Sequence, residues 1–286
     1  MGEMEVKAID SHIHLLDEKT LASKGERAQQ MARYFGRERK PVSIDELADQ
    51  YRARNMMAVI MNSTDQTVTG LTPVPNDHVV EAVRKHADVF LGFGVIDPWQ
   101  GKVALNEIRR IKDLGLHGIG EINPARQQFF PSDTRFYPLW EEIQKQGLPI
   151  LFHMGMAGAG AGTPGGMGFK LKYTQPIHLD DVAADFPQLT IIGAHPSWPW
   201  QEESLAICRH KANFFIDMSG WAPKYFPKEM VHYANTILQD KMLFGSDWPA
   251  IGVERWLEEF QELPIKPEVR QKILLENAKK LFKLNF

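Results

Sequence analysis

Residues 190–195 read TIIGAH, a short apolar run that ends on a histidine. The same pattern recurs in PILFH at 149–153 and in MLFGSD at 242–247, where an ionisable side chain again follows an apolar run. Such runs of Val, Ile, Leu and Phe are typical of parallel strands that are buried on both faces. The ionisable residues at these three strand ends are His195, His153 and Asp247.

Eight runs of this kind alternate with amphipathic segments along the chain. The strands that they predict are 6–9, 58–61, 90–95, 118–122, 149–152, 190–193, 214–216 and 242–244. Segments with helical spacing fill the gaps; two of them, 102–114 and 135–146, end at a glycine that can cap a helix. Eight strands that are each followed by a helix predict an α/β fold, the (β/α)8 TIM barrel, and an open doubly wound sheet is the alternative.

The length of 286 residues suits one such barrel, which typically needs about 250. We therefore expect residues 1–286 to form a single domain with two long additions. Residues 15–41 are an insertion after the first strand, which can cover the mouth of the barrel or form a dimer contact. Residues 155–172 are a Gly-rich loop after the fifth strand, which can act as a lid, cradle an anion or be a permissive connection.

The bulk composition is that of a globular protein with no strong electric field. The net charge is −3, and no basic stripe favours nucleic acid or an anionic membrane surface. No stretch approaches the roughly 20 apolar residues that span a bilayer, and the first residues do not resemble a secretory signal. The single cysteine, Cys208, excludes an intramolecular disulfide. These features predict a cytoplasmic protein that acts on a small molecule.

A metal site is the function that the strand ends indicate. The first strand ends in IDSHIH at 9–14, and His12 and His14 are two residues apart, so both rings point to one side of an extended strand. In a barrel the carboxyl ends of all strands converge on one mouth, where a buried histidine or aspartate without a partner would be costly. Three imidazoles and one carboxylate suit zinc, or manganese as the alternative.

The motifs IDSHIHL, FHMG, GAHPSWPW and LFGSDWP resemble those of the amidohydrolase superfamily, in the amidohydrolase-related branch that includes aminocarboxymuconate semialdehyde decarboxylase. The longer stretches HPSWPWQEESLAICRHKANFFIDMSGWAPKYFP and LKYTQPIHLDDVAADFP are most similar to a subgroup labelled aryl-β-ketoacyl-CoA hydrolase. By this resemblance, one divalent metal would be bound by His12, His14, His153 and Asp247. Asp247 would also be catalytic, together with His195 near the metal.

The fourth strand departs from a common pattern of the superfamily. Many members carry a carboxylated lysine there that bridges two metals, whereas this chain reads GIGEINP, with Glu121 and no lysine. The difference argues for one metal. It leaves open whether Glu121 contacts a second metal, positions the substrate or is only a polar strand end.

Two reactions fit these residues. In the first, a metal-activated water attacks a carbonyl of an acyl or keto-acid substrate, such as an aryl β-ketoacyl thioester, and the subgroup resemblance favours this hydrolysis. In the alternative, the enzyme is a non-oxidative decarboxylase of an aromatic or unsaturated carboxylic acid. A barrel that only binds a ligand is a third reading. The residues that we expect at the substrate are Trp198, Trp248, Glu121, Arg126 and Lys172.

Overall fold

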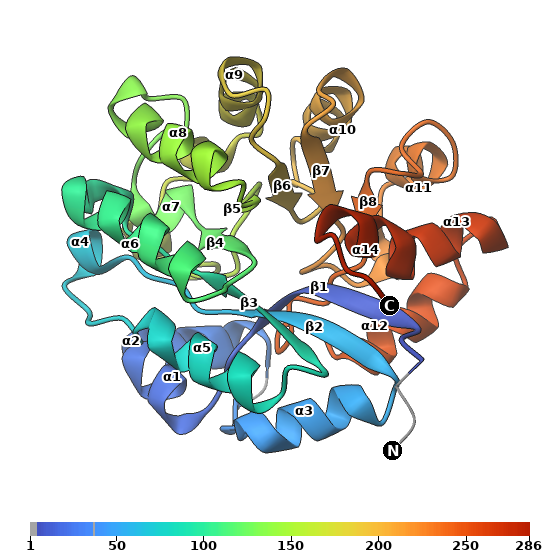
Figure 1. The fold of residues 1–286 in the computed structure, drawn as a ribbon, viewed down its shortest axis with the longest axis horizontal. Helices are drawn as coiled ribbons and strands as arrows, with labels where there is room; N and C mark the ends of the chain where they lie inside the picture. Colours follow the sequence, from blue (N-terminus) through green and yellow to red (C-terminus); the bar gives the residue numbers. More distant parts are fainter. Residues whose placement is uncertain (1–4, 37) are drawn as a thin grey trace.

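All eight predicted strands form, and they follow one another around a barrel. The computed structural model describes residues 5–36 and 38–286. Consecutive strands pair in parallel, in the order β1 to β8 (Figure 1). The strands are β1 (Ala8–His14), β2 (Met56–Met61), β3 (Phe90–Gly94), β4 (Gly118–Ile122), β5 (Ile150–His153), β6 (Ile191–Ala194), β7 (Phe214–Asp217) and β8 (Met242–Leu243). The TIM barrel prediction is confirmed.

Backbone hydrogen bonds between β1 and the segment after β8 close the barrel. Ser11 N donates to Phe244 O at 2.9 Å, and Asp247 N donates to His12 O at 2.9 Å. Strand β1 therefore continues to His14, five residues past its predicted end, because its polar residues are buried and paired with the last strand.

Helices cover the outside of the barrel (Figure 1). They are α3 (Ile44–Arg52), α5 (Asn76–Lys85), α6 (Lys102–Asp113), α8 (Tyr137–Gln146), α9 (Ile177–Asp185), α10 (Gln201–His210), α11 (Lys228–Ala234) and α12 (Val253–Gln261). Helix α3 begins with a side-chain cap, because Ser43 Oγ accepts a hydrogen bond from Glu46 N at 3.2 Å. None of the described helices combines the length and the apolar character needed to cross a membrane.

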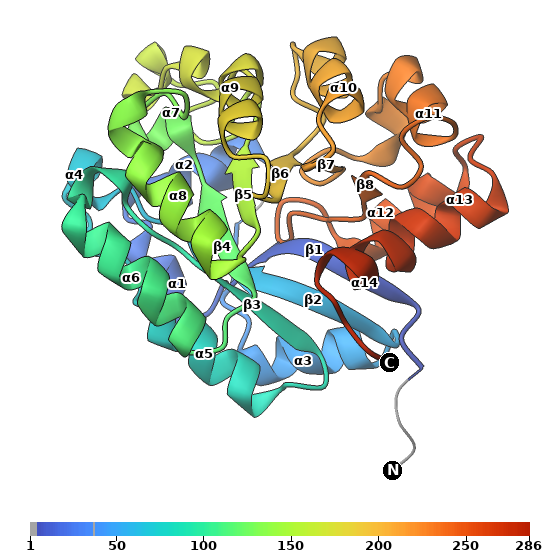
Figure 2. The ribbon, with the colours of Figure 1, turned by 45° about the horizontal axis from the view of Figure 1, so that its top comes forward.

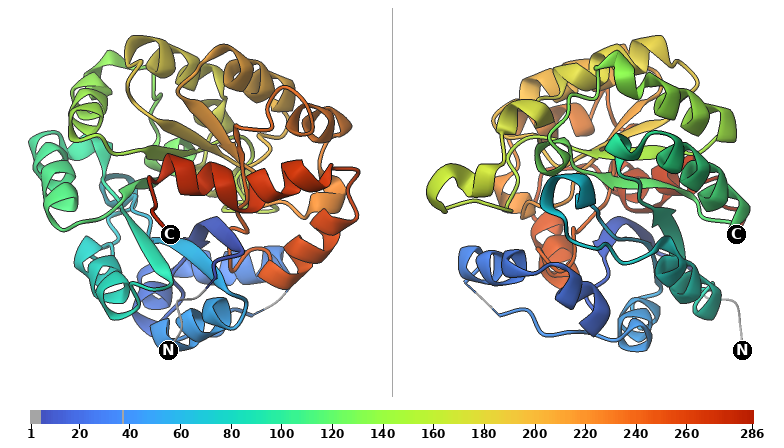
Figure 3. Two further views of the ribbon diagram at one scale, coloured as in Figure 1. Left: turned by 45° about the vertical axis from the view of Figure 1, so that its right-hand side comes forward. Right: turned by 90° about the vertical axis from the view of Figure 1, so that its left-hand side faces the viewer.

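Two apolar clusters fill the space around the strands. The larger lies between the strands and the helices, and the smaller includes Ile9, Val59, Leu151 and Ile192 inside the barrel. The C-terminal stretch consists of α13 (Pro267–Gln271), a π-helical turn (Lys272–Glu276) and α14 (Asn277–Leu281). Ala278 and Phe282 join the inner cluster, and the left view of Figure 3 shows this stretch crossing the strands.

The insertion after β1 folds into α1 (Glu18–Ser23) and α2 (Glu26–Tyr34). The side chain of Gln30 on α2 donates to the carbonyl of Ala161 at 3.0 Å and accepts from Gly160 N at 3.1 Å. The two additions to the barrel are thus joined to each other, and Figure 2 shows α1 and α2 in the context of the whole chain. Because residues of α1 and α2 line the pocket described below, the insertion covers the mouth of the barrel.

Candidate metal centre and its pocket

His12 and His14 lie side by side at the end of β1, as their spacing predicts. Their Nε2 atoms are 3.2 Å apart. Asp247, just after β8, places Oδ1 at 3.2 Å from His14 Nε2 and at 3.7 Å from His12 Nε2. Three potential ligands from the first and last strands therefore meet at one point.

Glu121 joins this group to the histidines of β5 and β6. Its Oε2 lies 3.7 Å from His14 Nε2, and its Oε1 lies 2.7 Å from His153 Nδ1. His195 Nε2 lies 3.0 Å from His153 Nδ1. We call these six residues the donor cluster; its members are His12, His14, Glu121, His153, His195 and Asp247. Glu121 is only 4% exposed, so it lies in the centre of this cluster and is not a solvated strand end.

Buried hydrogen bonds orient the rings of the donor cluster. His12 Nδ1 donates to Asp217 Oδ2 at 2.8 Å, which leaves Nε2 as the ring nitrogen that faces His14. His195 Nδ1 donates to the carbonyl of Ser219 at 3.1 Å, and Ser219 Oγ donates to Asp217 Oδ2 at 2.8 Å. A carboxylate that fixes the tautomer of a ligating histidine is a common support of metal sites.

The residues predicted from the sequence do not include Asp217 and Ser219. Asp217 is fully buried and follows the apolar run FFI of β7, which is the same signal that identified Asp247. The pattern at the end of the seventh predicted strand therefore indicates Asp217 as well.

A second buried carboxylate holds the segment that carries Asp247. Asp10 accepts hydrogen bonds from Ser246 N at 2.9 Å, Ser246 Oγ at 2.6 Å and Tyr51 Oη at 2.8 Å. Burial raises the pKa of Asp10 to about 6, although these hydrogen bonds oppose the rise. Asp10 thus ties the start of β1 to the turn beside Asp247.

The backbone at two members of the donor cluster is in the left-handed region. The φ angle is 79° at His195 and 56° at Asp247, and such angles in residues other than glycine concentrate at functional sites. Two glycines that contact this region have no room for a side chain. A Cβ at Gly220 would lie 2.5 Å from His195 Nδ1, and one at Gly245 would lie 2.0 Å from Oδ1 of Asp217, the carboxylate that orients His12.

The two carboxylates of the donor cluster have lowered pKa values. Burial opposes the charge on Asp247, but the hydrogen bond with His14 and the nearby His12 and His195 outweigh it and lower the pKa of Asp247 to about 2. Burial likewise opposes the charge on Glu121, and its hydrogen bonds with His153 and His195 hold its pKa well below the ordinary value. Both carboxylates are therefore anionic at neutral pH, which favours a bound cation.

The donor cluster fits a divalent metal ion. Ligands that lie about 2.0 to 2.2 Å from one cation are roughly 3 to 3.5 Å from each other, close to the 3.2 Å that separates His14 Nε2 from both His12 Nε2 and Asp247 Oδ1. The structure also leaves His153 Nε2 buried with no described hydrogen-bond partner. Imidazole nitrogens and carboxylate oxygens together are ligands that zinc and manganese accept.

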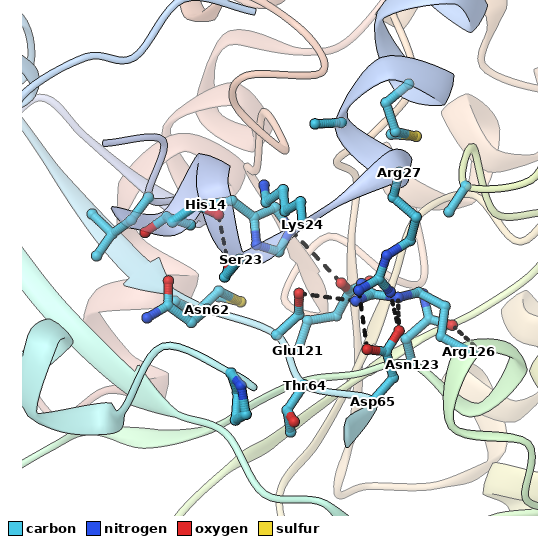
Figure 4. Close-up of a pocket in the computed structure, with 18 of the residues that line it drawn as sticks. His14, Ser23, Lys24, Arg27, Asn62, Thr64, Asp65, Glu121, Asn123 and Arg126 are labelled. Carbon is cyan, nitrogen blue, oxygen red and sulfur yellow. Dashed lines mark hydrogen bonds and ion pairs between the residues drawn. The ribbon is translucent and has the colours of Figure 1, made fainter. Parts of the chain in front are cut away.

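A pocket opens above the donor cluster, lined by residues from the barrel, the insertion and the Gly-rich loop (Figure 4). His14, Glu121, His153, His195 and Asp247 lie on its inner side. Its outer side includes Lys24 and Arg27 from the insertion, Arg126 from α7 (Pro124–Gln127), and the carboxylate of Asp65. Apolar side chains from several elements complete the lining, among them Leu21, Met31, Leu71 and Val74.

The predicted substrate contacts fall into two groups. Glu121 and Arg126 line the pocket. In the part of the chain that the structure describes, Trp198, Trp248 and Lys172 are not among the residues that line this pocket. Trp198 is 45% exposed with its ring 6.5 Å from that of Trp221, Trp248 packs against the main core, and Lys172 lies over the rings of Phe130 and Tyr173. Strand-end position alone does not show which way a following loop turns, and this explains the difference.

A TIM barrel with histidines and carboxylates gathered at the carboxyl ends of its strands defines a class of metal-dependent barrel enzymes. The family comparison is consistent with this class. The chain belongs to the amidohydrolase family, whose sequence profile matches residues 9–284. The expected superfamily is confirmed, whereas the aryl-β-ketoacyl-CoA hydrolase subgroup is not.

Individual proteins are similar to this chain in sequence or in fold. The chain is 23% identical over 250 residues to a gamma-resorcylate decarboxylase of Polaromonas sp. (strain JS666), which covers 73% of this chain and 75% of the relative. An uncharacterized TIM-barrel protein from Bordetella bronchiseptica superposes with a TM-score of 0.79 at 26% identity, covering 97% of this chain and 99% of the other. A dihydroxybenzoic acid decarboxylase from Polaromonas sp. JS666, solved with bound manganese, superposes with a TM-score of 0.67 at 19% identity over 98% of both chains.

Proposed function

We propose that this chain is a metal-dependent, non-oxidative decarboxylase of an aromatic carboxylic acid. The observation that carries the proposal is the likeness to gamma-resorcylate decarboxylases over about three quarters of both chains, combined with a donor cluster whose residues line a pocket. This reverses the preference of the sequence analysis for hydrolysis, which depended on the subgroup resemblance.

The metal would be held by His12, His14, His153 and Asp247, with Glu121 close enough to serve as a further ligand. When bound, a divalent cation would polarise the carboxylate of the substrate and its neighbouring oxygen. Manganese is a candidate because a decarboxylase of the same fold was solved with it, and zinc suits the same ligands. We expect a single ion, because the carboxylated lysine that bridges two metals in many superfamily members is absent.

The remaining chemistry belongs to residues of the chain. In the reaction the bond between the ring carbon and the carboxylate breaks, carbon dioxide leaves, and the electron pair stays on the ring carbon, which must take up a proton. Asp247 is placed to carry that proton from solvent to the carbon, because it lies both in the donor cluster and in the pocket lining. Nearby acidic groups raise the pKa of His195, although its burial opposes the rise, so His195 can donate from Nε2 to an oxygen that gains negative charge.

The decisive experiment compares two substrates on the same metal-loaded protein in deuterated water. With 2,6-dihydroxybenzoate we expect release of carbon dioxide and one deuterium on the product ring. An aryl β-ketoacyl thioester should release neither free thiol nor aryl carboxylic acid above background. Release of either product without any decarboxylation of aromatic acids would overturn the proposal in favour of hydrolysis, the reaction that the family name suggests.

A further inference from the structure

Asn62 carries a buried amide group with no partner. It directly follows β2, is 4% exposed and lines the pocket. Among the residues that the structure describes, none forms a hydrogen bond with its Oδ1 or its Nδ2. The preceding residue, Met61, belongs to the inner apolar cluster, and side chains alternate along an extended strand, so Asn62 points away from the barrel axis. A buried amide without a partner costs free energy, so Asn62 at this position does not serve the stability of the fold.

Thr20 brings a second such atom to the same pocket. It lies in the first turn of α1, is 4% exposed and lines the pocket. Its Oγ1 is buried and likewise has no hydrogen-bond partner in the described part of the chain. Leu15 N donates to Met61 O at 3.3 Å, so the chain that leads into α1 starts beside the residue before Asn62. The insertion and the end of β2 therefore both contribute unpaired polar atoms to this side of the pocket.

The surroundings of these atoms are uncharged and partly apolar. Leu15 and Val74 are buried and line the same pocket. We call Leu15, Thr20, Asn62 and Val74 the lateral subsite. Figure 4 shows Asn62 apart from the ion pairs that Arg27 and Arg126 form with Asp65. Because none of its four side chains is ionisable, the lateral subsite suits an uncharged group.

We propose that Asn62 and Thr20 are specificity-determining residues that bind a hydroxyl group on the ring of the substrate. This inference rests on the proposed function, which places the carboxylate of an aromatic acid at the donor cluster. The amide oxygen of Asn62 needs a donor and the amide nitrogen needs an acceptor, and one hydroxyl group supplies both. A carboxylate or a methoxy group has no hydrogen to donate, so either would leave Oδ1 unpaired.

The insertion controls access to the lateral subsite. Both Thr20 Oγ1 and the Asn62 amide are buried, so a ring hydroxyl group reaches them when α1 shifts relative to the end of β2. A site that is built to pair with a hydroxyl group discriminates against an analogue without one, because its own polar atoms then stay unpaired. The lateral subsite would thus select among aromatic acids that the donor cluster treats alike.

The test measures binding to a series of ring isomers and requires no turnover. Calorimetry on manganese-loaded protein compares 2-hydroxybenzoate with 2,3-, 2,4-, 2,5- and 2,6-dihydroxybenzoate, each of which adds one hydroxyl group to the same ring. We expect one isomer to bind about tenfold tighter than 2-hydroxybenzoate or more, because it pairs atoms that are otherwise unpaired. The compound with a methoxy group in place of that hydroxyl group should lose this gain.

Variants of similar shape assign the gain to the lateral subsite. Asn62→Leu removes both polar atoms, and the gain should fall to about twofold or less. The Tm of this variant without ligand should equal or exceed that of the wild-type protein, because an apolar group replaces unpaired polar atoms. Thr20→Val should reduce the gain to a smaller extent. The control Asn106→Leu, at an exposed position of α6, should keep the full gain.

The outcomes separate this inference from the proposed function. Equal affinity of the wild-type protein for all five acids would overturn the inference, whether or not the variants fold. An unchanged gain in Asn62→Leu would also overturn it, and a lower Tm together with that unchanged gain would indicate that a buried water pairs with the amide. A gain that depends on Asn62, in a protein that releases carbon dioxide from none of the five acids, would support the lateral subsite and contradict the proposed reaction.

Discussion

The donor cluster and the cationic side chains Lys24, Arg27 and Arg126 line the same pocket, but the chain supports them differently. Buried carboxylates and hydroxyl groups on the barrel hold the donor cluster, through Asp217 at His12 and through Asp10 at the turn beside Asp247. Lys24 and Arg27 lie on the insertion, where Arg27 pairs with Asp65 and Gln30 joins α2 to the Gly-rich loop. The difference teaches that the barrel itself holds the donor cluster, whereas a few side-chain contacts that substitutions can remove hold the insertion.

The largest effect should come from the donor cluster itself. Replacing Asp247 with Asn removes a candidate ligand and the proton carrier together, so we expect kcat to fall by about 10³-fold or more, along with the metal content. Steady-state kinetics and elemental analysis of the same sample measure both. Asp240→Asn, at an exposed ion pair with Lys272, is the control and should change neither. Full turnover in Asp247→Asn would show that the cluster is not the reaction centre.

The second-largest effect tests the support beneath the cluster. Asp217→Asn removes the carboxylate that orients His12, and we expect metal affinity to fall about 10- to 100-fold while the fold is kept. Calorimetric titration with manganese gives the affinity, and circular dichroism checks the fold. If Asp217→Asn bound metal as tightly as the wild-type protein, the barrel would not be the rigid support described here.

A smaller effect is expected where the insertion meets the Gly-rich loop. Gln30→Ala removes the side-chain hydrogen bonds to Gly160 and Ala161, so KM should rise a few-fold while kcat and metal content stay near the wild-type values. Gln29→Ala, at an exposed neighbouring position, is the matched control. A large loss of kcat in Gln30→Ala would mean that the insertion also takes part in the chemistry.

The smallest effect concerns stability in acid. Burial opposes ionisation of Asp65, but Arg126 and Arg27 lower its pKa below the ordinary value, so its ionised form stabilises the fold. That contribution is fully present above about pH 4 and is lost as the pH falls through the lowered pKa. Asp65→Asn should therefore cost about 1 to 2 kcal/mol at neutral pH, roughly 2 to 4 °C in Tm, and progressively less below pH 4.

Thermal melts of both proteins between neutral pH and acid measure this difference. A stability gap that stayed constant over the whole range would show that Asp65 acts through packing and not through its charge.

The barrel and the donor cluster were accessible from the sequence because both depend on local patterns. Alternating apolar runs give the strands, and a polar residue after such a run, such as His195, lies at the mouth by the geometry of the fold. The places of Lys24 and Arg27 at the pocket were not accessible in this way, because the insertion forms short helices whose direction is set by tertiary contacts such as the pairing of Asp17 with His78. Trp198 shows the converse: its position after a strand predicted a substrate contact, yet it is not among the residues that line the pocket.

Closure of the barrel has a consequence for biosynthesis. His12 is translated long before its neighbour Asp247 and the barrel-filling Phe282. A nascent chain that has not reached these residues consequently cannot assemble the complete donor cluster, whatever helices it has already formed. A metal ion held by the whole cluster could bind only after these later segments are made, and a ribosome stalled before residue 247 would carry only part of the donor cluster.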